Sequence, residues 1–284
     1  MNPELVLHVN HTILGEGPVW DHRVNQLWWV DIPCGLVHCY NPENDENKTY
    51  AIGQMVGAAI PCEVGGLILA LENGFAFFSP EDHRIKPIFD PESNMPTNRF
   101  NDAKCDPRGR LWAGTMRTDP PRDAVGSLYC LDSDLKTTKK LSAVKVSNGL
   151  AWTSKADKMF YIDTRNNVIM SFDYEIETGS IYDRNDFLTF DTLLPDGMCM
   201  DENDNLWVAF YSGARVCCFD TQNGNQLEQI DMPVANPTSC AFGGKALDTL
   251  YITTAANDGK DDGGALFAVK PGVKGCETNF FKYD

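Results

Sequence analysis

The chain lacks an excess of positive charge. Its 24 lysines and arginines stand against 40 aspartates and glutamates, and the formal net charge is -16. Proteins that bind nucleic acid rely on a basic stripe to neutralise phosphates, and none can be built from this balance. We therefore expect no nucleic-acid partner. A surplus of carboxylates is compatible with a cation site, although most of them belong on a solvated surface.

Histidine is scarce, and several catalytic signatures are missing. The chain has five histidines. It contains no G-x-S-x-G, no H-E-x-x-H, no phosphate-binding loop and no dinucleotide glycine pattern. These absences argue against a serine hydrolase with a histidine base, a histidine-rich zinc site and a nucleotide-dependent enzyme.

Long hydrophobic runs are also absent. The longest apolar segment, residues 64–78, is interrupted by Glu72, Asn73 and Gly74, so we expect no membrane span. The first residues carry no basic cluster or apolar run, which predicts no secretory signal. The ten cysteines include no C-x-x-C pair. We therefore predict a cytoplasmic protein with reduced thiols, buried in strand-like runs at Cys105, Cys130, Cys199 and Cys240.

Helical periodicity is missing as well, and a repeat stands in its place. Six times the chain presents a small or metal-binding residue, an apolar step, a polar turn and a second apolar run with β propensity. The repeats begin near positions 16, 58, 101, 148, 196 and 239, at intervals of 42, 43, 47, 48 and 43 residues. Periods of about 40 to 50 residues with four short strands each are typical of propeller blades.

The sequence thus predicts an all-β fold, a six-bladed β-propeller forming a single domain over residues 1–284. Residues 5–9 precede the first repeat and have no partner in their own blade. We expect them to close the ring by completing the last blade, beside residues 266–269 and 279–281, because such a join removes a free sheet edge.

The repeat also converts sequence spacing into a ring of side chains. In a propeller the inner strands line a central channel, so equivalent positions lie at one height. That ring reads Glu16, Ala58 or Ala59, Asn101, Asn148, Asp196 and Ser239. Carboxylate and amide oxygens are the ligands that Ca²⁺, Mg²⁺ and Mn²⁺ prefer. Asn-Gly and Asp-Gly are also common turn pairs that need no ligand, but their recurrence at one repeat position favours a cation site.

Several phrases resemble the SMP-30/gluconolactonase/luciferin-regenerating-enzyme family, and within it the regucalcin branch. The likeness follows the whole chain in order. It is carried by Gly15-Glu16-Gly17-Pro18-Val19-Trp20, Arg99-Phe100-Asn101-Asp102-Ala103-Lys104, Gly114-Thr115-Met116, Ser147-Asn148-Gly149-Leu150 and Pro195-Asp196-Gly197-Met198.

The resemblance implies a six-bladed propeller with one divalent cation near the channel mouth. The metal ligands would be Glu16, Asn148 and Asp196. Arg99 and Asn101 would hold sugar hydroxyls, although without the resemblance Arg99 reads as a surface ion pair. Asp119 occupies the place of a family acidic residue that is glutamate in regucalcin. The loop 117–124, with its two prolines, departs from the regucalcin pattern and would border the substrate.

The resemblance further implies a metal-dependent hydrolase that opens a sugar lactone, a small-molecule substrate. The cation, Ca²⁺, Zn²⁺, Mn²⁺ or Mg²⁺, would polarise the carbonyl. The base would be Asp196 or, alternatively, a metal-activated hydroxide. Two alternatives stay open: a non-catalytic calcium-binding or regulatory protein, and a relative acting on another ester or in luciferin recycling. We expect a monomer or weak dimer with no membrane partner.

Overall fold

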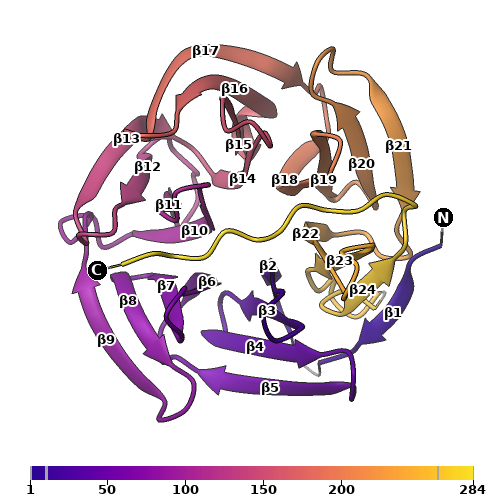
Figure 1. Cartoon of the computed structure of the whole chain (residues 1–284), viewed down its shortest axis with the longest axis horizontal. Coiled ribbons are helices and arrows are strands. Elements are labelled where there is room, and N and C mark those ends of the chain that lie inside the picture. The colour runs from indigo at the N-terminus through magenta and orange to yellow at the C-terminus, as the bar shows by residue number, and fades with distance from the viewer. Residues whose placement is uncertain (1, 10–11, 261, 284) are drawn as a thin grey trace.

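Six four-stranded antiparallel sheets surround a central axis, and in five of them the strands follow the chain from the axis outward (Figure 1). The computed structural model describes residues 2–9, 12–260 and 262–283. This confirms the predicted all-β, six-bladed β-propeller. The only helix in the described ranges is a single 3₁₀ turn, η1 (Thr164–Asn166), and no helix there could cross a bilayer.

The first three blades use consecutive strands. Blade 1 comprises β2 (Gly15–Asp21), β3 (Gln26–Asp31), β4 (Leu36–Asn41) and β5 (Glu46–Ala51). Blade 2 comprises β6 (Val56–Pro61), β7 (Leu67–Leu71), β8 (Gly74–Ser79) and β9 (Arg84–Phe89). Blade 3 comprises β10 (Asn98–Cys105), β11 (Leu111–Arg117), β12 (Gly126–Leu131) and β13 (Thr137–Val144).

The remaining blades continue the pattern until the ring closes. Blade 4 comprises β14 (Ser147–Trp152), β15 (Lys158–Asp163), β16 (Val168–Glu175) and β17 (Ser180–Thr189). Blade 5 comprises β18 (Leu194–Met200), β19 (Asn205–Tyr211), β20 (Arg215–Asp220) and β21 (Gln226–Asp231). Blade 6 comprises β22 (Pro237–Gly243), β23 (Thr249–Thr254), β24 (Leu266–Val269) and β1 (Glu4–Leu7).

Composition explains why each strand lies where it does. The innermost strands, such as β2 and β14, are buried at every residue, whereas the outermost strands β5 and β9 are mostly exposed and polar. Apolar side chains from neighbouring blades interlock between the sheets. Trp20, Trp29, Trp112 and Trp207 are among the largest fully buried side chains there.

Ring closure by the N-terminal strand is confirmed in part. β1 pairs antiparallel with β24, with Leu5 opposite Phe267. The expectation that residues 279–281 join the same blade is wrong. Instead, Phe281 forms a parallel bridge with Cys62 in blade 2. The apolar residues 280 and 281 have the composition of a strand, but Phe281 pairs with blade 2 instead of blade 6.

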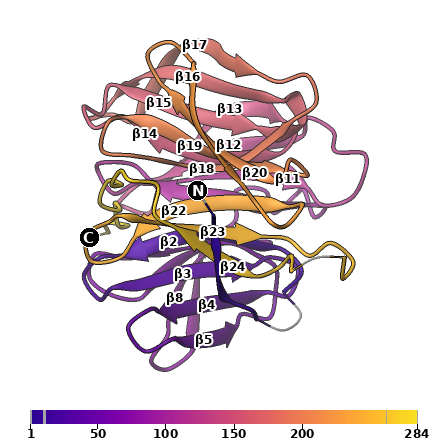
Figure 2. The same ribbon diagram turned by 90° about the vertical axis from the view of Figure 1, so that its right-hand side faces the viewer.

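The C-terminal segment, residues 273–283, crosses one end of the channel (Figure 1). Figure 2 shows the ring from the side, with the C-terminus at its left edge. Backbone N–H groups of the segment donate to Leu247 in blade 6, to Pro61 in blade 2 and to Gly109 in blade 3. Glu202 in blade 5 donates back to Lys274 at 2.8 Å. The segment therefore links four blades across one face.

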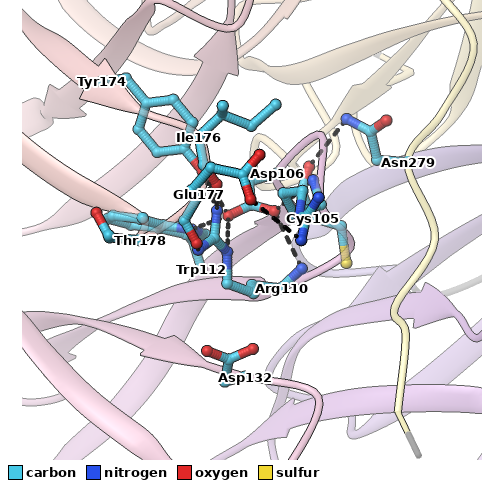
Figure 3. A network of polar contacts seen from close by, with 12 residues as sticks. Cys105, Asp106, Arg110, Trp112, Asp132, Tyr174, Ile176, Glu177, Thr178 and Asn279 are labelled. Carbon is cyan, nitrogen blue, oxygen red and sulfur yellow. Dashed lines mark hydrogen bonds and ion pairs between the residues drawn. The ribbon is translucent and has the colours of Figure 1, made fainter.

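A buried polar network joins blades 3 and 4 (Figure 3). Asp106, which is fully buried, accepts hydrogen bonds from Arg110 Nε at 2.7 Å, Trp112 Nε1 at 2.9 Å and the Tyr174 hydroxyl at 2.7 Å. Arg110 also donates to the Tyr174 hydroxyl at 2.8 Å. Each oxygen of this buried carboxylate is satisfied, so the network serves blade packing rather than ligand binding.

The thiols are also as predicted. All ten cysteines are free, and Cys105, Cys130, Cys199 and Cys240 are buried.

Candidate metal and substrate site

All six inner strands are irregular at the same height. The pairing between the first and second strand of every blade shifts register there, for example between Glu16 and Val19 and between Pro195 and Met198. A β-bulge bends a strand and redirects a side chain. The six bulges coincide with the ring of residues that the repeat predicted, at the start of the inner strands.

Glycine follows the ring residue where neighbouring inner strands come closest. A Cβ on Gly149 would lie 2.9 Å from the Asp196 carbonyl oxygen, and one on Gly197 would overlap Ser239 Oγ. A side chain at either position would push adjacent blades apart. The Asn-Gly and Asp-Gly pairs thus bring side chains of adjacent blades together across the channel.

Hydrogen bonds connect the amide side chains of blades 3, 4 and 5. Asn101 Nδ2 donates to the Ser147 carbonyl at 2.7 Å and to Asn148 Oδ1 at 3.2 Å. Asn148 Nδ2 donates to Thr164 Oγ1 at 2.8 Å, and Thr164 in turn donates to the Pro195 carbonyl at 2.7 Å. These bonds fix the Asn148 amide with its oxygen on the side of Asn101.

Three buried carboxyl groups lie in this region: Glu16, Asp102 and Asp196. Burial raises the pKa of Glu16 to about 8, and the negative charge of Asp102 adds to the effect. Burial also raises the pKa of Asp196 well above its usual range, and the negative charges of Glu16 and Asp102 raise it further. The Glu16 and Asp196 carboxyls are close enough to hydrogen-bond. Their ionised forms therefore need a compensating cation.

The donor set fits a hard divalent cation. Among the described residues no three His, Cys, Asp or Glu side chains gather closely enough to hold a metal by themselves. A cation here would therefore use the Glu16 and Asp196 carboxylates with the Asn148 amide oxygen. Oxygen ligands of this kind suit Ca²⁺, Mg²⁺ or Mn²⁺, whose charge would offset the buried acids.

Arg99 is buried beside the acids rather than exposed in a surface ion pair. Its Nη1 donates to the Phe100 carbonyl and to Asn101 Oδ1, both at 2.8 Å. Burial lowers the pKa of Arg99 to about 10, and the nearby positive charge of Arg122 contributes. In the described part of the chain no partner is seen for Nε or Nη2, so these groups remain to donate to a substrate.

The structure brings five of the six predicted site residues into one buried group: Glu16, Arg99, Asn101, Asn148 and Asp196. Asp119 differs, because it is exposed on the loop after β11, where its charge acts on Arg122. Sequence reasoning missed Asp102 and Thr164. Asp102 stands in the Arg99–Lys104 phrase next to Asn101, and this adjacency was the available signal.

A cavity of about 300 Å³ lies at the opposite end of the inner strands. It is lined by Val19, Ala151, Met200 and Phe242 from the ends of those strands and by residues 276–279 of the C-terminal segment. Lys104 also lines it, and its Nζ donates to the Met198 carbonyl at 2.6 Å. The C-terminal segment covers this end, so a substrate must reach the acids from the other mouth.

Known proteins share this arrangement. Residues 14–256 match the SMP-30/gluconolactonase/LRE-like region. The chain belongs to the SMP-30/gluconolactonase/luciferin-regenerating-enzyme family. The family assignment agrees with the phrases that surround Glu16, Asn101, Asn148 and Asp196.

Relatives and solved structures cover nearly the whole chain. Xenopus laevis regucalcin is 34% identical over 284 residues, 94% of each chain. A Bacillus subtilis protein, YvrE, described provisionally as a sugar lactone lactonase, is 38% identical over 245 residues, 86% of this chain and 84% of its own. A luciferin-regenerating enzyme superposes with a TM-score of 0.93 at 33% identity, over 99% of this chain and 100% of its own. Membership therefore supports a lactonase-type hydrolase.

Proposed function

We propose that this protein is a divalent-cation-dependent lactonase that hydrolyses a sugar lactone at the open mouth of the propeller channel. The observation that carries the proposal is the buried set of Glu16, Asp196 and Asn148 oxygens beside an arginine without a carboxylate partner. Buried acids of this kind require a cation. Family membership supplies the reaction class.

The cation and Arg99 would stabilise developing negative charge, and Asp196 would transfer a proton. When bound, the cation would act as a Lewis acid that polarises the lactone carbonyl. Asp196 would accept a proton from the attacking water, as a general base held close to the reacting carbon. The free N–H groups of Arg99 would donate to the oxyanion that forms as water adds. Collapse of that species breaks the ring C–O bond, and the proton taken up by Asp196 passes to the departing ring oxygen, which leaves a hydroxy acid.

Asn101 and Asp102 would support these roles. Asn101 accepts from Arg99 and donates to Ser147 and Asn148, so it sets the orientation of both the arginine and the amide ligand. Asp102 accepts from the Ala103 N–H at 2.7 Å and adds negative charge near Glu16. Asp119 would contact the substrate from the loop, a role for which its exposure is suitable.

A lactone panel run across Ca²⁺, Zn²⁺, Mn²⁺ and Mg²⁺ tests the proposal. We expect glucono-1,5-lactone hydrolysis to stop on chelation and to return with at least one of these cations. Asp196→Asn removes the base and replaces a charged ligand with a neutral amide oxygen, so kcat/KM should fall at least about 100-fold. Absence of turnover with every lactone and cation would reject the enzyme. Arg184→Gln, on the outer strand β17, is the matched control.

The leading alternative is a non-catalytic calcium-binding or regulatory protein, because regucalcins are among the relatives. Calcium binding that depends on Asp196, measured by calorimetry, without turnover of any lactone would favour it. Turnover of another ester or of a luciferin precursor instead would place the protein on a different branch. We also propose a cytoplasmic location, supported by ten free thiols, and a monomer or weak dimer.

A further inference from the structure

Arginines in this acidic chain fall into two groups. Six of the ten form ion pairs with carboxylates: Arg23, Arg84, Arg108, Arg110, Arg117 and Arg184. The other four, Arg99, Arg122, Arg165 and Arg215, have no ion pair within the described residues. With 40 acidic side chains available, unpaired arginines need an explanation.

Three of the four are linked by electrostatic reach, Arg99 with Arg122 and Arg122 with Arg165. Arg122 lies on the loop after β11, and its Nη1 donates back to the Arg117 carbonyl. Arg117 pairs with Asn98, the residue before Arg99, and the Thr118 N–H donates to the Thr97 carbonyl at 2.8 Å. The loop is therefore anchored beside Arg99.

Arg165 reaches the same region from blade 4. It follows Thr164, whose hydroxyl bridges Asn148 and the Pro195 carbonyl. The Arg165 side chain is exposed, so we place it at the rim of the site, where buried residues give way to solvent-exposed ones. It directly follows Thr164, which orients the predicted metal ligand Asn148. The isolated bridge between Met116 and Val146 brings the ends of blades 3 and 4 together at this height.

Arg122 lies within electrostatic reach of both other arginines. Burial lowers the pKa of Arg122, and the charge of Arg165 lowers it further, while Asp119 opposes this. Burial also lowers the pKa of Arg99, the charge of Arg122 adds to the effect, and the charges of nearby glutamates oppose it. Arg99 thus has acids close to it, whereas Arg122 and Arg165 form no ion pair within the described residues, and an anion would offset their charge.

We propose that the substrate is a lactone with a second, anionic group, a carboxylate or a phosphate, which Arg122 and Arg165 bind at the rim. This inference rests on the proposed lactonase function. Guanidinium groups bind both anions through paired, charge-assisted hydrogen bonds. Arg99, deeper in the site, stays with the lactone carbonyl. Two guanidiniums from separate elements would fix the far end of the substrate and orient its ring toward Asp196.

The test compares one neutral and two anionic lactones. Glucono-1,5-lactone is neutral, 6-phosphoglucono-1,5-lactone carries a phosphate and glucaro-1,4-lactone a carboxylate. We expect kcat/KM for one anionic lactone to exceed that for the neutral one at least about tenfold, and the excess to shrink as salt is raised. The better of the two identifies the anion. Equal efficiency on all three would overturn the inference and leave the lactonase intact.

Variants separate the rim from the rest of the site. Arg122→Gln and Arg165→Gln should each reduce the ratio of anionic to neutral kcat/KM about tenfold, and Arg122→Lys should retain part of it. Arg184→Gln, which loses an exposed ion pair with Asp186, should leave the ratio unchanged. An unchanged ratio in both rim variants would refute the assignment.

Direct binding distinguishes failure of the inference from failure of the lactonase. If no lactone is hydrolysed, calorimetry with 6-phosphogluconate, glucarate and gluconate still measures how tightly Arg122 and Arg165 bind an anion. Tighter binding of either of the first two, lost in Arg122→Gln, would support an anion site in a protein that is not a lactonase. Equal binding of all three would reject the anion site as well.

Discussion

At the scale of single residues, the site is defined by acids that are costly without a cation. Glu16, Asp102 and Asp196 are buried together, and their neighbours provide only part of the compensating charge. Natural proteins accept such unfavourable burial where function requires it. The empty site is therefore expected to lower the stability of the fold, and this expectation can be measured.

Glu16→Gln should reduce a pH dependence of the chelated protein. The pKa of Glu16 is about 8 in the fold, against an ordinary value of 4.5 for a solvated glutamate. The folded state thus keeps a proton that the unfolded chain releases, so stability should fall as pH rises from about 4.5 to 8. Asp102 and Asp196 also have raised pKa values, so the variant should show a smaller slope rather than none. It should be more stable than wild type at pH 8, by up to about 3–5 kcal/mol.

Urea unfolding in chelator at pH 5 and pH 8 checks the prediction for Glu16. The exposed Glu228→Gln on β21 is the control and should follow wild type. Added calcium or manganese should raise the stability of wild type more than that of Glu16→Gln, because a ligand that binds only the folded state stabilises it. A slope as steep in Glu16→Gln as in wild type would show that Glu16 does not contribute to it.

Which residues could be predicted follows from where they lie in the repeat. Glu16, Asn101, Asn148 and Asp196 stand at one repeat position, so a periodic reading collects them. Arg122 and Arg165 lie in connections of different length and shape, and no period relates them. The buried state of Arg99 depends on how the inner strands of neighbouring blades pack around the channel, which local sequence does not reveal.

At the scale of elements, the bulge near the start of each inner strand sets the width of the channel. Gly197 occupies the bulge of β18, and Ser239 on β22 fills the space that a side chain would need. The shared geometry of six bulges explains why the repeat was readable at all. Each blade places a turn-forming pair where the strand must bend, and these pairs produce the sequence signal.

Gly197→Ala should destabilise the contact between blades 5 and 6. The added Cβ would overlap Ser239 Cβ and lie 2.8 Å from its Cα. Because backbone must shift, we expect a loss of about 1–3 kcal/mol. Thermal unfolding of Gly197→Ala, Ser239→Gly and the double variant forms a cycle. The double variant should lose less than the sum, since Ser239→Gly removes the nearest atoms. Simple additivity would contradict the proposed clash.

At the scale of the whole molecule, one end of the ring is covered by the protein's own C-terminal segment. The C-terminal segment links blades 2, 3, 5 and 6 over the cavity, with Phe281 fully buried among side chains of blades 2 and 3. The number of blades was predictable from the spacing of the six repeats. Ring closure was predictable because residues 5–9 are a strand-like run with no partner in their own blade. The path of residues 279–281 was not, because a short apolar run does not specify which edge it meets.

Phe281→Ala should measure how strongly this cover holds the ring. Removing a fully buried phenylalanine costs about 3–5 kcal/mol. Phe281 belongs to the core cluster that includes Ile60, Phe75 and Phe100, and its ring centroid lies 6.2 Å from that of Phe77. Phe89→Ala, on the exposed edge strand β9, should cost far less. Denaturant midpoints compare the two. Equal, small losses would show that the segment only rests on the surface.

The pairing of β1 with β24 has a consequence for synthesis. The outermost strand of blade 6 is made before every other strand of the ring, and its partner β24 (Leu266–Val269) is made after all of them. Blades 1 to 5 can form in order as the chain leaves the ribosome, but the circle stays open until residue 269 is free. Such a distant contact slows folding, and until it forms, the edges of β1 and β24 are exposed to neighbouring chains. Chaperone demand should therefore be greatest in the interval before β24 leaves the ribosome, when a nearly complete ring still lacks this strand.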